Sequence, residues 1–218
     1  MIKGVIFDFD GVIVDSEYIS YECYRDFLKT YNIIFTKEDY IKYCPGKQLI
    51  TTMNFFKEFY DLDIDIDQAC QYFRNREQYY LDKDGVPLKK GVKELLDYLV
   101  SKKIAICLAT SSVEKRAITI LDNYQLTKYF DAFVFGDEVK RGKPFPDVFL
   151  KACKKINVQK NETIVIEDSE AGIEAGYNAK IRVICIPDMK YPDDKYQLMT
   201  CNIYRDLTNI IKYIETVG

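Results

Sequence analysis

The stretch Lys3 to Glu17, "KGVIFDFDGVIVDSE", decides how this chain folds. Its apolar residues 4–7 form a continuous run, which is typical of a strand buried on both faces of a parallel sheet. Two carboxylates, Asp8 and Asp10, stand at the end of that run. Because residues two apart on a strand face the same side, we expect both carboxylates to point toward one spot.

Like charges at the end of an apolar strand repel each other and are costly to remove from water. A bound divalent cation would remove that cost. Gly11 follows directly and allows the backbone to turn sharply and to approach a bound group. Aspartates also commonly end strands and begin turns, so this stretch by itself leaves a purely structural role open.

The length and composition suffice for a folded protein with a hydrophobic core. The chain has 218 residues, of which 48% are hydrophobic, and a formal net charge of -3. This length suits one large domain or one domain that carries an insertion. The mixed charge predicts no nucleic-acid partner and no attraction to an anionic membrane. No segment resembles a membrane span or a signal peptide, so we expect a cytoplasmic protein with no membrane partner.

The spacing of the cysteines and the absence of histidine exclude several classes of reaction and metal site. Seven cysteines are scattered without paired spacing, which predicts reduced thiols rather than disulfides. The chain has no histidine. This excludes Ser-His-Asp and Cys-His hydrolases and histidine-ligated zinc. Any reaction must therefore use carboxylates, hydroxyls and lysines, alone or with a hard metal ion.

Short apolar runs alternate with helical patterns over most of the chain. The strands predicted after the first lie at residues 104–109, 132–135, 163–167 and 183–186. The predicted helices lie at residues 92–101, 113–124, 146–156, 171–178 and 207–214. Strand and helix in repeated alternation predict an α/β fold with a parallel sheet.

Residues 16–86 differ from the rest of the chain. They contain no convincing strand, and their aromatic and aliphatic residues recur at helical spacing. We therefore expect a helical domain at residues 16–86, inserted into an α/β domain that consists of residues 1–15 and 87–218. The aromatic residues are expected to form the core of the insertion rather than a ligand cage.

Polar residues also follow the later strands of the α/β part. They are Thr110, Ser111, Ser112, Lys143, Glu167, Asp168 and Ser169. In open α/β sheets, ligands bind outside the carboxyl ends of the strands. Carboxylates, a hydroxyl and an ammonium at these ends predict a site for Mg²⁺ and a phosphoryl group. Each residue alone could instead be a helix cap, a turn residue or a surface charge.

This ordered set resembles the haloacid dehalogenase (HAD) superfamily. Residues 8–12, "DFDGV", match its first motif, Thr110 the second, Lys143 the third, and Glu167-Asp168 the fourth. "GKPFPD" and "EDSEAGIEAG" are similar to its beta-phosphoglucomutase-like branch. The resemblance implies a Rossmann-like parallel-sheet core with an inserted α-helical cap domain.

The resemblance also implies roles for the acidic residues. Asp8 is expected to be the nucleophile that becomes an aspartyl-phosphate, and Asp10 the general acid and base. The cofactor is expected to be Mg²⁺, held by Asp8, by the backbone carbonyl of Asp10 and by Asp168. Glu167 is expected to support this metal site. Oxygen ligands suit Mg²⁺ better than zinc.

The remaining candidates are expected to hold the substrate. Thr110 and Lys143 should hold the transferring oxygens together with backbone N–H groups that follow Asp8. Further substrate-binding candidates are Gly11 and Ser111 in the core and Lys47, Gln48 and Arg76 in the cap. The cap residues could equally be ordinary solvated helix residues.

The resemblance favours phosphate chemistry, because dehalogenases and phosphonate hydrolases of the superfamily lack an acid at the position of Asp10. Family mutases carry a histidine where this chain has Ser20, and an arginine shortly after a cap glycine where Lys47 follows Gly46. We therefore expect a phosphatase, a phosphoric monoester hydrolase acting as a monomer on small phosphorylated metabolites such as sugar phosphates. The alternatives are a beta-phosphoglucomutase-type mutase and a catalytically idle phosphate-ligand-binding module.

Overall fold

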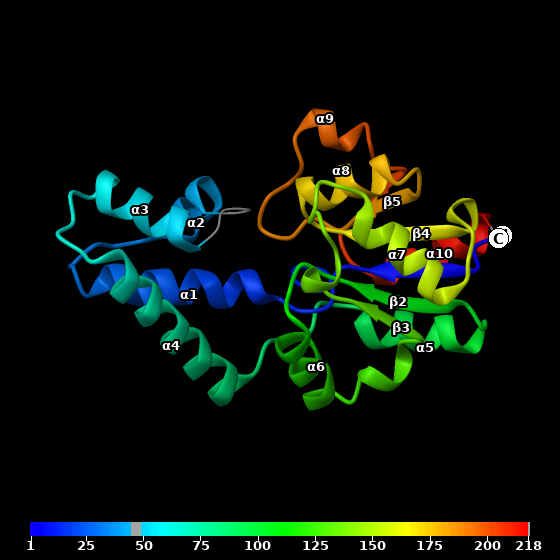
Figure 1. Ribbon diagram of the computed structural model, residues 1–218, viewed down its shortest axis with the longest axis horizontal. Helices are drawn as coiled ribbons and strands as arrows, with labels where there is room; N and C mark the ends of the chain where they lie inside the picture. Colours follow the sequence, from blue (N-terminus) through cyan, green and yellow to red (C-terminus); the bar gives the residue numbers. More distant parts are fainter. Residues whose placement is uncertain (45–48, 218) are drawn as a thin grey trace. The chain divides into compact units, whose positions relative to one another are not determined.

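The computed structural model describes residues 1–44 and 49–217 (Figure 1). The chain divides into two compact units, one of Met1–Asp15 with Leu88–Gly218 and one of Ser16–Pro87. The sequence placed the second boundary between residues 86 and 87, and Pro87 belongs to the helical unit. Among the described residues, no helix combines the length and the apolar character that a bilayer crossing requires.

The larger unit is built on one parallel sheet. Its strands are β1 (Gly4–Phe7), β2 (Ala105–Ala109), β3 (Ala132–Val134), β4 (Thr163–Glu167), β5 (Arg182–Cys185) and β6 (Asn202–Ile203). Their order is β3-β2-β1-β4-β5-β6, and every neighbouring pair is parallel. The chain therefore builds outward from β1 in one direction and from β4 in the other. This is the Rossmann order, and its topological switch point lies between β1 and β4.

Helices cover both faces of this sheet (Figure 1). They are α5 (Val92–Ser101), α6 (Glu114–Asn123), α7 (Asp147–Ile156), α8 (Glu170–Asn178), the one-turn α9 (Asp194–Gln197) and α10 (Thr208–Val217). Right-handed crossovers put α5 and α6 on one face, because they connect strands in one direction, and α7 and α8 on the other. In agreement, α7 and α8 pack together against the strands, and α5 packs against α10 and β2.

The apolar side chains of the sheet fill both interfaces. Ile6, Cys107 and Val165 are partners in register on neighbouring strands and pack with Val148 and Phe149 of α7. All five are nearly or fully buried. Burial raises the pKa of the Cys107 thiol to about 12, so it behaves as a small apolar side chain. All seven cysteines are free thiols, as the sequence predicted.

The smaller unit consists of α1 (Ser16–Lys29), α2 (Lys37–Tyr43), α3 (Leu49–Phe59) and α4 (Ile66–Asp84). The helices α1 and α3 both pack against α4. Aromatic rings form its core, as expected from their spacing. The ring of Tyr24 lies 5.4 Å from Phe56 and 4.6 Å from Phe73, measured between centroids, and all three side chains are buried.

A polar network joins α1 to α4 within this unit. The carboxylate of Asp26 accepts hydrogen bonds from the Arg76 guanidinium and, at 2.8 Å, from the Tyr80 hydroxyl. Burial acts to raise the pKa of Asp26, but the hydrogen bonds from Tyr80 and Arg76 outweigh it and lower the pKa. Arg76, a substrate-binding candidate, is thus engaged with an acid of its own domain.

The Asp26 network makes stability depend on pH. Because the pKa of Asp26 is lower in the folded state, its contribution is complete above the ordinary carboxyl pKa and is lost as pH falls through the lowered value. We expect Asp26→Asn to lower the unfolding free energy by about 1–3 kcal/mol at pH 7. The deficit should shrink toward pH 2, measured by urea denaturation across pH. Asn at the exposed Asp63 is the control, and a deficit constant with pH would contradict the assignment.

Candidate active site

The switch point of the sheet brings two acidic segments together. Asp8 directly follows β1, and its backbone N–H donates to the carbonyl of Ile166 in β4 at 3.0 Å. Glu167 is the last residue of β4, and Asp168 follows it. The side chains of Asp8 and Glu167 are buried. The ends of two adjacent central strands therefore deliver three carboxylates to one place.

These carboxylates form a tight cluster. Asp8, Glu167 and Asp168 each offer an oxygen within 4.8 Å of the others. Burial raises the pKa of Asp8, the ammonium of Lys143 opposes this and the charge of Glu167 adds to it, and the resulting pKa is about 7. Burial, followed by the charges of Glu167 and Asp8, also raises the pKa of Asp168 well above its usual value. The cluster therefore favours any cation that can enter it.

The ammonium group of Lys143 lies within the carboxylate cluster. Its Nζ lies 2.8 Å from Asp8 Oδ1 and 2.5 Å from Glu167 Oε1, and only 7% of its side chain is exposed. Burial favours the neutral amine, but the charges of Asp8 and Glu167 raise the pKa of Lys143 above its ordinary value. One ammonium against three carboxylates leaves negative charge that a divalent cation would balance.

The donor set fits Mg²⁺. It consists only of oxygens, which are the ligands that Mg²⁺ prefers. Asp8 Oδ1 is buried, and the ammonium of Lys143 lies 2.8 Å from it. Glu167 is different, because its Oε2 accepts from the backbone N–H groups of Asp168 and Ser169 and from the Ser169 hydroxyl. Each of the three carboxylates can offer an oxygen to a metal, and Asp8 and Glu167 also pair with Lys143.

Gly11 allows the two segments to approach each other. Its φ is +78°, a conformation that favours glycine. A Cβ at this position would lie 2.2 Å from Asp168 Oδ2. Gly11 is therefore required by its backbone conformation, as the sequence indicated, and also by the Asp168 carboxylate beside it.

The side chain of Asp10 lies apart from this cluster. Its Oδ2 accepts hydrogen bonds from Ser112 Oγ at 2.6 Å and from Arg116 Nη1 at 3.0 Å. The expectation that Asp8 and Asp10 point to one spot assumed strand geometry, but β1 ends at Phe7 and the chain then turns. The Asp10 side chain is therefore paired with Ser112 and Arg116, and the metal and proton-transfer roles expected of Asp10 stay predictions.

The second motif lies where β2 ends. Thr110 is buried, its N–H donates to Val134 of β3, and its Oγ1 accepts from the Ser112 N–H at 2.9 Å. Ser111 is exposed in the same loop. The sequence analysis placed Ser112 among the polar residues after this strand without giving it a role, and it missed Arg116. A signal existed for Arg116, because a cation in the first turn of a helix is unfavourable with the helix dipole unless an acid compensates it.

The structure describes one of the three substrate-binding candidates in the helical unit. Lys47 and Gln48 lie outside the described residues. Arg76 is described, and its guanidinium contacts Asp26 and Tyr80. The roles of these three residues in substrate binding stay predictions.

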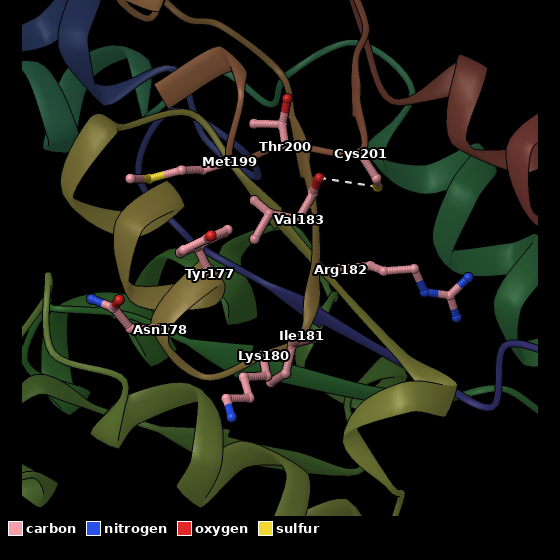
Figure 2. A pocket seen from close by; sticks show the side chains of 9 residues that line it. All are labelled: Tyr177, Asn178, Lys180, Ile181, Arg182, Val183, Met199, Thr200 and Cys201. Carbon is pink, nitrogen blue, oxygen red and sulfur yellow. Dashed lines mark hydrogen bonds between the residues drawn. The ribbon is translucent and has the colours of Figure 1, made fainter. Parts of the chain in front are cut away.

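A separate pocket of about 580 Å³ lies at the other end of the sheet (Figure 2). Residues that begin β5 and residues that precede β6 line part of it. Beside the pocket, the Cys201 thiol donates to the Val183 carbonyl at 3.1 Å. Its charged lining residues are Lys180 and Arg182, with no carboxylate. This pocket therefore has no metal-binding character and lies away from the acidic cluster.

Comparison with known proteins settles the family. Residues 5–186 match the model of the haloacid dehalogenase-like hydrolases. The chain belongs to this family. The expected resemblance and the Rossmann-like fold class are thereby confirmed.

Individual relatives point to phosphate esters. The phosphorylated carbohydrates phosphatase of Thermotoga maritima is 34% identical over 84% of this chain and 83% of its own length. Hexitol phosphatase A of Escherichia coli is 27% identical over 84% of this chain and 82% of its own length. A crystal structure of a provisionally named beta-phosphoglucomutase from Thermotoga maritima has a TM-score of 0.84, 28% identity and full coverage of both chains. These phosphatases support the prediction of a phosphoric monoester hydrolase.

The close approach of Gly11 to Asp168 can be tested by adding one methyl group. Gly11→Ala should place a Cβ against the Asp168 carboxylate and strain the backbone, and we expect about a 100-fold loss of phosphatase kcat/KM. Gly142→Ala is the matched control, since its Cβ would meet nothing within 4 Å. Equal activities of the two variants would contradict the requirement for glycine at position 11.

Proposed function

We propose that this protein is a Mg²⁺-dependent phosphatase that hydrolyses small phosphorylated metabolites, sugar phosphates among them, through an aspartyl-phosphate on Asp8. The observation that carries this proposal is the buried carboxylate cluster at the switch point, bridged by Lys143. The names of the phosphatases similar to this chain support the same class of substrate.

In this proposal Asp8 attacks phosphorus. Asp8 would bind Mg²⁺ with Asp168 and the Asp10 backbone carbonyl, and the bound ion would offset the charges of the carboxylates and the phosphoryl group. Lys143 keeps one oxygen of Asp8 oriented by its ion pair. The bond from Asp8 to phosphorus forms as the bond to the leaving alcohol breaks.

Other residues handle the proton and the transferring oxygens. The Asp10 carboxyl would protonate the leaving alcohol and then take a proton from the water that hydrolyses the intermediate. Thr110 and Lys143 would stabilise the charge on the transferring oxygens. Thr110 is held for this role by burial and by the Ser112 N–H. Gly11 and Ser111 would bind the phosphoryl group from the adjacent loops.

The nucleophile and the metal can be tested together. We expect wild-type protein with Mg²⁺ to hydrolyse p-nitrophenyl phosphate, and EDTA to abolish this activity reversibly. Asp8→Asn should lose turnover by a factor of at least about 10⁴ and keep its fold, because the amide cannot form the acyl-phosphate. Circular dichroism checks the fold. Tight phosphate binding without hydrolysis of any phosphomonoester by the wild type would instead support an idle binding module.

A mutase is the second candidate, favoured by the similarity to the provisionally named beta-phosphoglucomutase structure. A mutase must pass the phosphoryl group to a second hydroxyl rather than to water. The chain has no histidine and carries Ser20 where the family mutases have that residue, which favours the phosphatase.

Phosphorus NMR separates these two activities. With beta-glucose 1-phosphate and Mg²⁺, we expect inorganic phosphate to accumulate. Glucose 6-phosphate formed without free phosphate would contradict the phosphatase and establish the mutase. A phosphatase-dead Asp8→Asn sample is the control for spontaneous hydrolysis.

A further inference from the structure

We propose that Arg116, together with Ser112, is a positioning residue that fixes the Asp10 carboxyl for proton transfer to the leaving alcohol. This inference rests on the proposed phosphatase function and adds a residue that the four motifs do not contain. Arg116 acts through Asp10 and needs no contact with the substrate.

The contacts form a closed triangle. Arg116 Nη1 lies 2.9 Å from Asp10 Oδ1 and 3.0 Å from Asp10 Oδ2, and it donates to Ser112 Oγ at 2.9 Å. Ser112 Oγ in turn donates to Asp10 Oδ2 at 2.6 Å. Two donors therefore meet the same carboxyl, which limits rotation about both of its side-chain torsions.

The triangle ties together elements that are distant in sequence. Asp10 belongs to the loop after β1, whereas Ser112 lies in the loop after β2 and Arg116 in the first turn of α6. Ser112 lies two residues before α6 begins, and its hydroxyl accepts the hydrogen bond from Arg116 across this turn. The guanidinium carbon also lies 5.9 Å from the ring centroid of the buried Phe9. The contacts of Arg116 and Ser112 with the Asp10 carboxyl, here called the clamp, thus have a rigid support next to Asp10.

The Asp10–Arg116 ion pair is expected to contribute little to the stability of the fold. The side chain of Asp10 is 34% exposed and that of Arg116 is 25% exposed. Ion pairs with such access to water contribute little to the unfolding free energy. Arg116 also stands near the positive end of the helix dipole, which disfavours a cation there. The main consequence of the pair is the orientation of Asp10.

Orientation of Asp10 matters because proton transfer requires hydrogen-bond reach to the leaving oxygen. In the reacting step, the bond from Asp8 to phosphorus forms, the bond from phosphorus to the alcohol oxygen breaks, and a proton passes from Asp10 to that oxygen. Without the clamp, the Asp10 carboxyl could turn toward the cluster of Asp8 and Asp168. The contacts with Arg116 and Ser112 therefore hold the Asp10 carboxyl in one orientation, away from that cluster.

The test compares two esters that differ in their need for a proton. An alkyl leaving group, as in glucose 6-phosphate, requires protonation, whereas p-nitrophenolate leaves as a stable anion. We expect Arg116→Met to lower kcat/KM for glucose 6-phosphate about 10- to 100-fold and for p-nitrophenyl phosphate less than about threefold. The ratio of the two losses is the readout, and kcat/KM reports the step in which the leaving group departs.

Three controls separate positioning from a general structural role. Lys115→Met removes the neighbouring exposed cation of α6 and should leave both esters unchanged. Arg116→Lys should restore part of the loss. In an Asp10→Asn background, Arg116→Met should cost less than about a further twofold, because a residue acting through Asp10 has nothing left to orient.

Equal losses for both esters, or a full loss in the Asp10→Asn background, would overturn the inference. Ser112→Ala is a second test: we expect it to lower kcat/KM for glucose 6-phosphate more than for p-nitrophenyl phosphate, by a smaller factor than Arg116→Met. Thermal denaturation of each variant checks folding. Hydrolysis of both esters by the wild type tests the proposed function by itself, so the failure of one proposal is distinguishable from the failure of the other.

Discussion

The site depends on one buried ion-pair arrangement, the ammonium of Lys143 held between Asp8 and Glu167. Carboxylates at the ends of two apolar strands would be too costly to desolvate without it. Glu167 anchors this arrangement, because its other oxygen accepts three hydrogen bonds from the turn that begins α8. Asp8 is thereby left with an oriented carboxylate that has few internal partners, which is the condition for a nucleophile and a metal ligand.

The sheet topology explains why these residues meet. The strand order reverses between β1 and β4, so the loops that follow these strands diverge and leave a crevice for a ligand. Asp8 and Asp168 flank this crevice, and Thr110 stands at the end of the neighbouring β2. Gly11 completes it by leaving room for the Asp168 carboxylate. The same scaffold serves many reactions, so the assignment to phosphate esters depends on these side chains and on the relatives rather than on the fold alone.

Much of the fold could be predicted because its signals are local. The strand Thr163–Glu167 and the helix Val92–Ser101 were predicted to the residue, since both have strong apolar patterns and clear ends. The two-residue β6 and the one-turn α9 were missed, because elements this short have no period to detect. In the site, the sequence indicated the carboxylates and Lys143. It indicated Ser112 only as a polar residue after a strand and did not indicate Arg116, because the contacts of both with Asp10 are set by tertiary packing across two loops.

The central claim is that Asp8 captures phosphorus covalently beside a bound cation. A crystal structure with Mg²⁺ and beryllium trifluoride tests it most directly, because the fluoride mimics an acyl-phosphate. The account predicts beryllium bonded to a carboxylate oxygen of Asp8, with Mg²⁺ bound by Asp8, the Asp10 carbonyl and Asp168. Beryllium trifluoride or Mg²⁺ bound at any other place would contradict it.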